Sequence, residues 1–428
     1  MKAVSSKPRV AVVGGGWAGC AAALTLAESG VAVTLYEASR TLGGRARAVE
    51  LEGQALDNGQ HILLGAYEQT LQLIDRLHPA TAQNGLWRLP LTLEQPPEFS
   101  LRCPRLPAPL HLLAGLLGAR GLNWGEKLAA TRWARALLNS AATVDHLSVS
   151  QFTRSQPEKL NRLLWHPLCV SALNTPPEIA SAQVFRDVIR AAFGGRTHHS
   201  DLLLPRRDLT ALFPAPAAAR LVELGGKVCL PCRVTSLDAS AEGVTLATRD
   251  ESTVYSHVIL AVAPQHLAGL AAAIPELESG ARDVASYHYQ PIATGYVQYA
   301  PGFRLARPLF ALADGPAQFV FDRGQSHGQA GLLAFVSSAT ANLSADWLTQ
   351  AEAQLRRITP PGPARWRKRI IEKQATYACV PGMPRPSVRT AHPRIFLAGD
   401  YTEGPYPATL ESATRSGVQS AGALLEQL

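Results

Sequence analysis

Three glycines near the start of the chain have the spacing of a phosphate-binding turn. Gly14, Gly16 and Gly19 follow a short apolar run, Arg9–Val13, and open an alanine-rich stretch. In a Gly-x-Gly-x-x-Gly turn the first glycine permits the sharp bend and the second lets the backbone approach a pyrophosphate, while the third lets helix and strand pack closely. The free N–H groups and the positive end of the following helix then face the phosphates. The spacing therefore predicts a dinucleotide-binding site.

A carboxylate and a second glycine turn follow the first turn. Glu37 ends a second apolar run about twenty residues later, where a carboxylate accepts hydrogen bonds from ribose hydroxyls. Gly43 and Gly44 form another flexible turn, and Arg45 adds a permanent cation near the phosphates. The combination is more specific than the glycine pattern alone, and it favours dinucleotide binding over a merely structural turn.

The far end of the chain carries a second set of binding groups. Gly399 and Asp400 end an apolar run, and a carboxylate at that position can bind a ribitol chain. Thr409 and Leu410 open a stretch, 408–425, that is expected to be a helix whose N-terminus can point at a flavin. A domain for NAD alone has no need of this distant clamp, so we expect the cofactor to be FAD. No second glycine fingerprint indicates a nicotinamide, which leaves the electron donor open.

These segments resemble a known superfamily. Glu37–Arg45 resembles flavin-containing amine oxidases and phytoene desaturases, and the segments 399–402 and 408–413 resemble the carotenoid-desaturase branch. The superfamily often has an arginine two places before the paired glycines, where this chain has Thr41. The neighbouring Arg40 is the candidate for that phosphate contact.

The resemblance also implies a role for Val234. This valine follows a strand-like run, 227–233, and in the superfamily the equivalent strand lays backbone groups against the adenine. A place in the apolar core is compatible with that role.

A closer resemblance covers nearly the whole chain. Three long segments, Asp57–Tyr67, Trp165–Pro177 and Leu204–Pro214, resemble the squalene-associated desaturase group, understood as hydroxysqualene dehydroxylases. The resemblance implies reductive removal of the hydroxyl of a C30 isoprenoid alcohol to give squalene. Loss of an allylic hydroxyl leaves a delocalised cation, which reduced flavin can quench with hydride. The protein must therefore exclude water and supply an acid.

The acid is sought among side chains that the resemblance places near the flavin. His61 and Asp57 are the candidate catalytic residues, and a histidine titrates close to neutral pH, which suits it to proton donation. The alternative is that Asp57 caps a turn and His61 only forms a hydrogen bond beside the flavin. Tyr401 and Glu403, next to Asp400, are rival acids.

Two other functions use the same scaffold. The first keeps FAD and reverses the redox direction, so that a carotenoid precursor is desaturated. The second is a prenyl-lipid carrier that has lost its flavin. The intact set of Gly14, Gly16, Gly19, Glu37 and Asp400 argues against the carrier.

The residues around the motifs predict the elements that position them. Arg9–Val13 and Val31–Tyr36 are typical of buried strands, and Ala18–Gly30 is expected to be a helix that ends at its glycine. A strand–helix–strand opening implies a parallel sheet with helices on its faces. Further strands are expected at 255–262, at 394–399 and within 303–337, the last of these in a separate antiparallel sheet.

The expected fold class is α/β, with a Rossmann-like FAD-binding domain of the amine-oxidase type and a second substrate domain of mixed sheet and helices. The FAD-binding domain is expected to take residues 1–65, 205–275 and 385–428. The substrate-binding domain is expected to take residues 66–204 and 276–384.

The amino-acid composition limits which ligands and surfaces the protein is expected to bind. Charged residues make up only 17% of the 428 residues, which favours an apolar tunnel or surface. A leucine-rich segment, 110–120, lies within a stretch, 105–122, that could be either an amphipathic helix in a membrane interface or an ordinary helix over the substrate domain. The net charge of +8 fits an anionic cofactor or lipid surface. No motif or dense basic run indicates nucleic acid.

Two clusters have metal-ligand residue types but weak patterns. Cys229 and Cys232 have redox or zinc spacing without a second pair, and they fall in a run expected to be a strand, where positions three apart face opposite sides. His198, His199 and Asp201 form one short cluster that is typical of a solvated loop. We expect no metal and reduced thiols in the cytoplasm, with peripheral contact at the inner face of the membrane if 105–122 is interfacial.

Overall fold

A parallel sheet at one end of the molecule is assembled from distant parts of the chain. The computed structural model describes residues 8–78, 85–139, 143–240, 242–339 and 343–428. All neighbouring strands of this sheet run parallel, in the order β10-β2-β1-β14-β20. Its strands are β1 (Arg9–Val13), β2 (Ala32–Tyr36), β10 (Lys227–Cys229), β14 (His257–Leu260) and β20 (Ile395–Leu397). The two ends of the chain and a central stretch therefore share one sheet.

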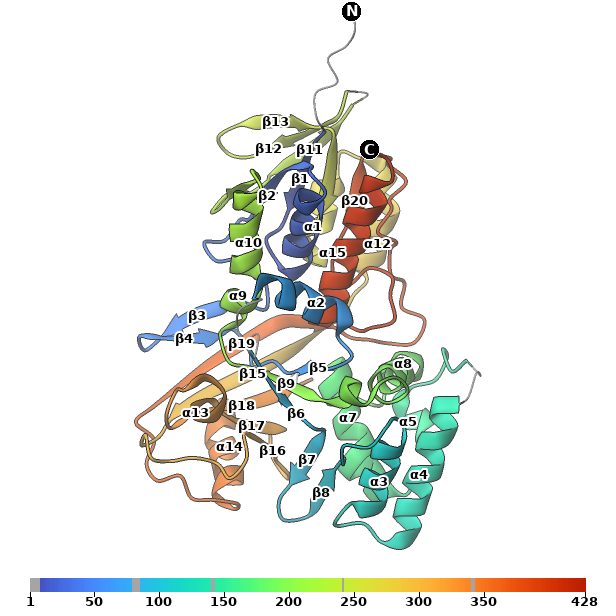
Figure 1. The fold of residues 1–428 in the computed structure, drawn as a ribbon, viewed down its shortest axis with the longest axis vertical. Helices are drawn as coiled ribbons and strands as arrows, with labels where there is room; N and C mark the ends of the chain where they lie inside the picture. The colour runs from blue at the N-terminus through green and yellow to red at the C-terminus, as the bar shows by residue number, and fades with distance from the viewer. Residues whose placement is uncertain (1–7, 79–84, 140–142, 241, 340–342) are drawn as a thin grey trace, which may run out of the picture.

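Helices from both ends of the chain pack beside this sheet. α1 (Trp17–Glu28) packs against α15 (Leu410–Leu425) and α10 (Pro214–Glu223), as Figure 1 shows. A side chain in place of Gly417 would collide with the Ala18 carbonyl, so the glycine lets α15 approach α1 closely. Most of α1 is buried, including its alanines, because it lies between neighbouring helices and the sheet.

The expected strands around the first motif are confirmed, and one expected strand is wrong. β1 and β2 flank α1, and Gly30, with a φ of 81°, follows the end of that helix. The run 227–233 forms strand only as far as Cys229, and a turn begins at Leu230. Pro231 has no N–H to donate to a ladder, so the strand does not continue through it. The chain then forms a three-stranded antiparallel sheet from β11 (Ser236–Ala239), β12 (Val244–Ala247) and β13 (Ser252–Tyr255).

A five-stranded antiparallel sheet forms the second half of the molecule, as expected for the segment 303–337. The strands follow the order β16-β17-β18-β15-β19. They are β15 (Tyr289–Gln298), β16 (Leu309–Ala311), β17 (Phe319–Asp322), β18 (Leu332–Ser338) and β19 (Trp366–Tyr377). The helix α14 (Trp347–Arg356) packs on this sheet, since Trp347 and Leu348 join the buried cluster around Val297 and Phe335.

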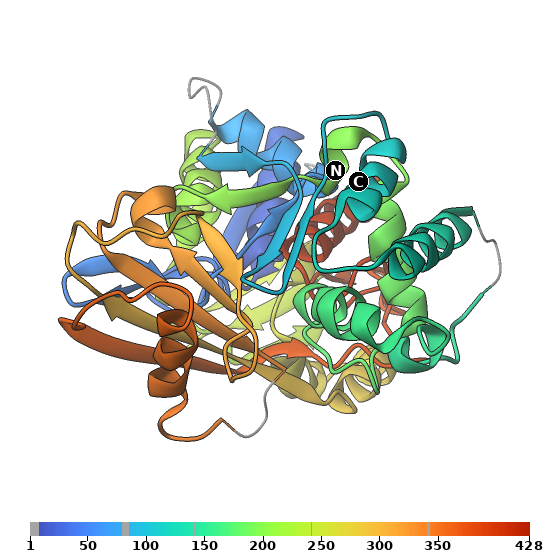
Figure 2. The same ribbon diagram turned by 90° about the horizontal axis from the view of Figure 1, so that it is seen from below.

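A group of helices lies beside that sheet, on the right in Figure 1 and Figure 2. Its members are α3 (Leu110–Gly118), α4 (Trp124–Asn139), α5 (Val149–Phe152), α6 (Glu158–Leu160), a π-helix (Asn161–Trp165), α7 (His166–Leu173) and α8 (Ala182–Phe193). Among the described residues, no helix is long and apolar enough to cross a membrane.

Shorter elements connect the two halves. The small sheets contain β3 (Ala48–Leu51) with β4 (Gln54–Asp57), β5 (Leu63–Leu64) with β9 (Leu202–Pro205) and β6 (Leu86–Leu89), and β7 (Thr92–Gln95) with β8 (Phe99–Arg102). The remaining helices are α2 (Glu68–Leu77), α9 (Leu209–Leu212), α11 (Pro264–Ala271), α12 (Glu278–Ala285), α13 (Arg323–His327) and two 3-10 turns, Thr197–Ser200 and Pro275–Leu277. The boundaries expected for the FAD-binding and substrate-binding domains stay a proposal.

Candidate cofactor and active site

The first glycine turn lies between β1 and α1. Gly14 has a φ of 110°, and its N–H donates to the Tyr36 carbonyl over 2.7 Å. A Cβ at Gly14 would collide with the Ala261 carbonyl, and one at Gly19 would collide with the Gly14 carbonyl. Protein packing therefore explains these two glycines, because the turn and the helix approach the backbone too closely for a side chain.

Gly16 has a different reason to be a glycine. Its φ of −75° suits any residue, and a Cβ built there would meet only Gly44 Cα, at 3.9 Å. The protein itself thus has room for a side chain at this position. Gly16 precedes the first N–H groups of α1, where a helix binds anions. The space is the cradle that a bound pyrophosphate requires.

The structure brings the second glycine turn against the first. Gly43 donates its N–H to the Gly15 carbonyl over 2.8 Å and pairs with Gly16 as an isolated bridge. Gly43 and Gly44 both have positive φ, at 113° and 61°. The two turns therefore form one continuous strip of backbone with no side chain between Gly16 and Gly44.

Glu37 lies at the end of β2, next to this strip. Its carboxylate accepts the Gly15 N–H and the Ser39 N–H, each over 2.7 Å. A carboxylate has about four acceptor positions, so two remain for ribose hydroxyls. Arg40 is exposed, within reach of solvent and of an anionic ligand. The roles of both residues stay predictions.

An ion pair joins the N-terminal and C-terminal groups. The Arg45 guanidinium donates to both carboxylate oxygens of Asp400 over 2.7 Å, and it also donates to the Ala375 carbonyl over 2.9 Å. Asp400 follows Gly399 after β20 and is 6% exposed. Arg45 follows Gly44 directly, so Asp400 lies close to the glycine turns although 355 residues separate the two ionic partners. One bound ligand can therefore contact both the glycine turns and Asp400.

α15 begins beside Asp400. Thr409 is its N-cap and accepts the Ser412 N–H over 3.1 Å, and Leu410 is its first residue. Ser412 Oγ donates to the Asp400 backbone carbonyl over 3.1 Å. The positive end of α15 therefore lies next to the carboxylate that is predicted to bind the ribitol.

Sequence reasoning missed the role of Glu411. This carboxylate is fully buried and accepts the N–H groups of Gln69 and Thr70, over 3.1 and 2.9 Å, at the start of α2. It also accepts the Thr70 hydroxyl and pairs with Arg415. An acid in the first turn of a helix, next to an expected cofactor motif, was the available signal.

Val234 lies in the extended chain after the turn at Leu230. It is buried in the same apolar cluster as Tyr36 and Tyr255. Cys229 accepts the Glu37 N–H through its carbonyl and Cys232 donates its N–H to the Glu37 carbonyl, so this segment is tied to the end of β2. Both thiols are free, and burial raises the pKa of each.

Asp57 and His61 lie near each other but in different surroundings. Asp57 is 1% exposed, and its carboxylate accepts the Leu209 N–H over 2.8 Å and Arg323 over 3.1 Å. Burial raises the pKa of Asp57, while the Arg323 guanidinium and the Leu209 N–H oppose that rise. The carboxylate therefore holds β4, α9 and α13 together.

His61 is half-buried and leaves one ring nitrogen for chemistry. Its Nδ1 bonds the Gly59 carbonyl over 2.7 Å, and among the described residues no hydrogen bond engages Nε2. Burial and the nearby Arg45 lower the pKa of His61, although the Gly59 carbonyl and Asp57 oppose that effect. The Asn58 side chain donates to the Arg45 carbonyl over 3.3 Å, so the segment that carries His61 lies beside Arg45.

The two rival acids differ in burial. Tyr401 is 1% exposed, and its hydroxyl has no hydrogen-bond partner among the described residues. Burial and Asp400 raise the pKa of Tyr401, so it keeps its proton and can serve as a donor. Glu403 is exposed, which leaves its carboxylate in solvent.

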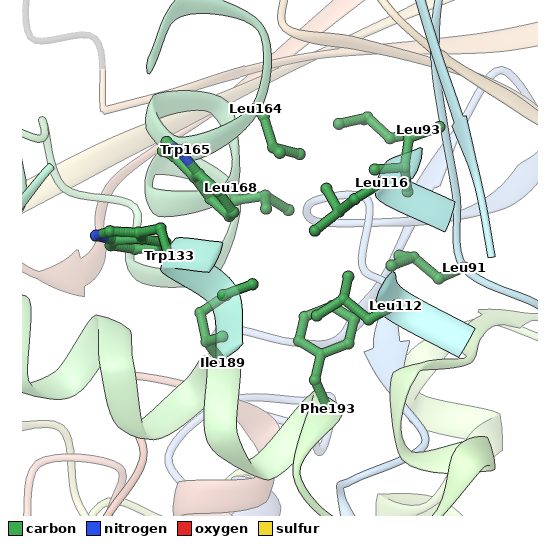
Figure 3. A pocket seen from close by; sticks show the side chains of 12 residues that line it. Leu91, Leu93, Leu112, Leu116, Trp133, Leu164, Trp165, Leu168, Ile189 and Phe193 are labelled. Carbon is green, nitrogen blue, oxygen red and sulfur yellow. The ribbon is translucent and has the colours of Figure 1, made fainter. Parts of the chain in front are cut away.

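A wholly apolar cavity lies among the helices of the second half. Its lining side chains come from β7, β8 and the chain before β7, and from α3, α4, the π-helix, α7 and α8, and Figure 3 shows most of them. The lining includes Leu93, Leu112, Leu116, Trp133, Trp165 and Leu168. From Leu168, α7 leads to Asn174, whose side chain donates to Thr376 Oγ1 over 2.9 Å. The neighbouring Ala375 carbonyl binds Arg45, so α7 connects the cavity to the ion pair.

The histidine cluster is committed to other contacts. His199 faces Glu68 over 3.5 Å, and Asp201 pairs with Arg88 over 3.2 Å. In the described part of the chain, no group of three histidine, cysteine or acidic side chains could hold a metal ion.

The residues present fit FAD. Gly16 leaves a cradle beside Gly44, and no packing contact explains why Gly16 lacks a side chain, while Glu37 and Asp400 offer carboxylates at separate points beside it. A pyrophosphate linking an adenosine to a ribitol needs this combination of bare backbone and two carboxylates.

Comparisons with known proteins agree with the assignment of a flavin cofactor. The model of the family described as flavin containing amine oxidoreductase matches residues 17–425. The chain is 27% identical to the hydroxysqualene dehydroxylase of Rhodopseudomonas palustris, with 97% of this chain and 98% of that protein covered. It is 26% identical to that of Sinorhizobium fredii, with 98% of each covered. The zeta-carotene desaturase of Arabidopsis thaliana is 23% identical, with 97% of this chain and 85% of that protein covered.

Solved structures share the fold. An oxidoreductase from Methanosarcina mazei superposes with a TM-score of 0.75 at 15% identity, covering 97% of this chain and 99% of that one. A triple mutant of a putrescine oxidase superposes with a TM-score of 0.73 at 18% identity, covering 99% of both chains. The chain belongs to the family of flavin-containing amine oxidoreductases, and it is an oxidoreductase whose cofactor is FAD.

Proposed function

We propose that this enzyme removes the hydroxyl of hydroxysqualene reductively and releases squalene. The observation that carries the proposal is the similarity to hydroxysqualene dehydroxylases along nearly the full length of both partners, 97% of this chain and 98% of the Rhodopseudomonas protein. Membership of a flavin-containing oxidoreductase family disfavours the flavin-less carrier that the sequence left open.

The apolar lining of the small cavity, about 20 Å³, favours an isoprenoid substrate that widens the cavity when it binds. Leucine and tryptophan side chains line it, and none of its exposed lining surface is polar. The six steps from Leu168 to Asn174 correspond to about 9 Å of helix, a length that part of a C30 chain can span. In this proposal one arm of the substrate lies against the apolar lining that includes Leu168, and its alcohol carbon lies near the ion pair of Arg45 and Asp400.

Each side chain of the site has a part in the proposed reaction. Bound FAD, when reduced, supplies the hydride that replaces the hydroxyl, while one proton leaves with the hydroxyl as water. His61 is the proposed donor of that proton, through Nε2. Asp57 is a positioning residue, because its buried pair with Arg323 holds the segment that carries His61. The apolar walls keep out water, which would otherwise recapture an allylic cation.

The test is a single-turnover reaction with the holoenzyme. The protein is reduced without oxygen, mixed with hydroxysqualene, and extracted for squalene by chromatography with mass detection. We expect one squalene per reduced flavin and a matching return of the oxidised flavin absorbance. Reoxidation without squalene, or no reoxidation, would contradict the assignment.

Desaturation of a carotenoid precursor is the second candidate. Its support is the similarity to zeta-carotene desaturase, which covers 97% of this chain. The proposed reduction is favoured because the dehydroxylases are more similar to this chain, at 27% and 26% identity against 23% for the Arabidopsis desaturase. Oxidised enzyme mixed with phytoene would gain absorbance from new conjugated double bonds if the second candidate were correct.

A further inference from the structure

Exposed apolar side chains gather on one hairpin of helices. Of the twelve large apolar side chains that are exposed in the described part of the chain, five lie between residues 106 and 128. Trp124 is 70% exposed and Leu110 is 54% exposed, and the other three are Leu106, Leu117 and Leu128. Such a concentration exceeds the scattered exposed leucines of an ordinary surface.

α3 and α4 are apolar on two faces. Leu112 and Leu116 on α3 and Trp133 on α4 point inward and line the cavity, as Figure 3 shows. Leu110 and Leu117 lie on the other face of α3, and Trp124 and Leu128 share a face of α4 at helical spacing. α3 contains no Asp, Glu, Lys or Arg, and a helix that is apolar all round needs apolar surroundings on both sides. A single helical layer separates the cavity from this outer face.

Cations surround the outer apolar face. Between residues 105 and 135 the chain carries five basic residues, and Glu126 is the one carboxylate. Arg105, Arg120, Arg132 and Arg135 are exposed and form no ion pair with any described residue. Lys127 lies over the Trp124 ring at 4.9 Å, and Glu126 accepts the Asn123 N–H of its own turn. We name these five apolar and five basic side chains the α3–α4 surface.

The apolar and basic side chains of the α3–α4 surface together indicate which partner it binds. Tryptophan and leucine flanked by arginine and lysine are the composition of elements that lie in a bilayer interface, with the apolar side in the acyl region and the cations at anionic headgroups. A second copy of this chain would bring five like charges against five, which repels. An anionic bilayer satisfies both the apolar and the basic part of the surface.

We propose that the α3–α4 surface docks the enzyme on an anionic lipid bilayer, so that hydrocarbon passes between α3 and α4 into the cavity beneath. The docking does not depend on which reaction the enzyme catalyses. Vesicle binding is measured without substrate, so a failure of this proposal is distinct from a failure of the proposed function.

The test is flotation of the holoenzyme with vesicles. Phosphatidylcholine vesicles with and without phosphatidylglycerol are mixed with protein, and the bound fraction is measured across a salt series. We expect binding that requires phosphatidylglycerol and weakens with salt. The pair Trp124→Ser and Leu128→Ser should lower the partition coefficient at least about tenfold, since both apolar anchors are lost. Arg132→Gln and Arg135→Gln should lower it about fivefold each.

Matched controls come from the opposite end of the molecule. Val254 is 52% exposed on β13, and Arg249 is exposed in the bend between β12 and β13, so Val254→Ser and Arg249→Gln should bind vesicles as the unaltered protein does. All variants should keep the flavin absorbance of the unaltered holoenzyme, which shows that they fold. Equal flotation of every variant would overturn the proposal. A dimer that the Trp124 and Leu128 changes convert to monomer without lipid would also overturn it, since the surface would then join two copies.

Discussion

Among single residues, His61 is the proposed proton donor, and its surroundings determine whether its ring carries a proton. Its Nδ1 is held by the Gly59 carbonyl, which orients the ring and leaves Nε2 for the substrate. Burial favours the neutral ring and lowers the pKa of His61 below its ordinary 6.5. A histidine with a lowered pKa carries the proton that it donates mainly at low pH.

This reasoning predicts a pH dependence. Because only the protonated ring can donate, turnover should be highest at low pH and fall as pH rises through a midpoint below 6.5. His61→Gln should lower kcat by about 10²- to 10⁴-fold and remove that limb of the profile. The measurement is single-turnover flavin reoxidation against pH, with FAD content checked by absorbance. An unchanged limb in the variant would assign the acid elsewhere, with Tyr401 next in line.

Gly16 allows cofactor binding to be separated from folding. A Cβ there would meet only Gly44 Cα, at 3.9 Å, so Gly16→Ala should fold normally. The added methyl group would occupy the space proposed for the pyrophosphate, and we expect FAD affinity to fall at least about tenfold, which is roughly 1.4 kcal/mol. Titration of the apoprotein with FAD, followed by flavin fluorescence, measures the change.

Two other glycines serve as controls for that experiment. No atom lies within 4 Å of a Cβ at Gly118, so Gly118→Ala should change neither stability nor FAD affinity. Gly19→Ala would push a methyl group into the Gly14 carbonyl and should lower the melting temperature even without FAD. If Gly16→Ala unfolds like Gly19→Ala, the glycine serves packing and the cradle interpretation is wrong.

At the scale of elements, α2 and α15 are joined by one carboxylate. Glu411 in the first turn of α15 satisfies the N–H groups of Gln69 and Thr70 at the start of α2. These are donors that a helix leaves unpaired at its own N-terminus. A segment next to His61 is thereby tied to the helix that begins beside Asp400.

Loss of this carboxylate should weaken the fold. Glu411→Gln places an amide NH₂ opposite buried N–H donors, and we expect the free energy of unfolding of the apoprotein to fall by roughly 2–4 kcal/mol. Urea denaturation followed by circular dichroism measures it. Glu426→Gln, at the exposed end of the same helix, should change stability by less than about 0.5 kcal/mol. Equal effects of the two changes would show that burial of Glu411 is not what matters.

For the whole molecule, the cofactor-binding groups come from segments that are far apart in sequence. Gly16, Arg45 and Asp400 adjoin one sheet built from residues 9–13, 32–36, 227–229, 257–260 and 395–397. A ligand that contacts several of these segments binds only when they are assembled. FAD should therefore stabilise the entire fold.

The expected size follows from mass action. With free FAD at a hundred times its dissociation constant, the holoenzyme should be about 2.7 kcal/mol more stable than the apoprotein, and its melting temperature should rise with FAD concentration. Differential scanning calorimetry of both forms provides the measurement. Melting temperatures that coincide would mean that FAD does not bridge the segments.

The helices and strands that depend on neighbouring residues could be predicted from the sequence. The strand, helix and strand around Gly14–Gly19 were expected and are present, because apolar period and turn residues act within a few positions. The same rule overextended the strand at 227–233, where the apolar pattern continued but Pro231 lacks a ladder donor. Pattern alone did not distinguish the strand from the turn that follows it.

Contacts across the chain were not predictable. The pairing of Asp57 with Arg323 spans 266 residues and that of Gln69 with Glu411 spans 342, and no local signal connects such partners. Sequence reasoning grouped Asp57 with His61 as catalytic candidates, since both lie in one segment. Their different burial became visible only after folding.

By itself the sequence determined that this protein binds a dinucleotide and carries two carboxylates for it, because a glycine turn and the residues that follow it act over short stretches of backbone. Only the tertiary structure decided that Gly16 and Gly44 share one cradle and that Arg45 grips Asp400. It also decided that α3 and α4 present apolar faces both to a cavity and to solvent. These features depend on burial and on contacts between distant segments, which packing of the whole chain creates.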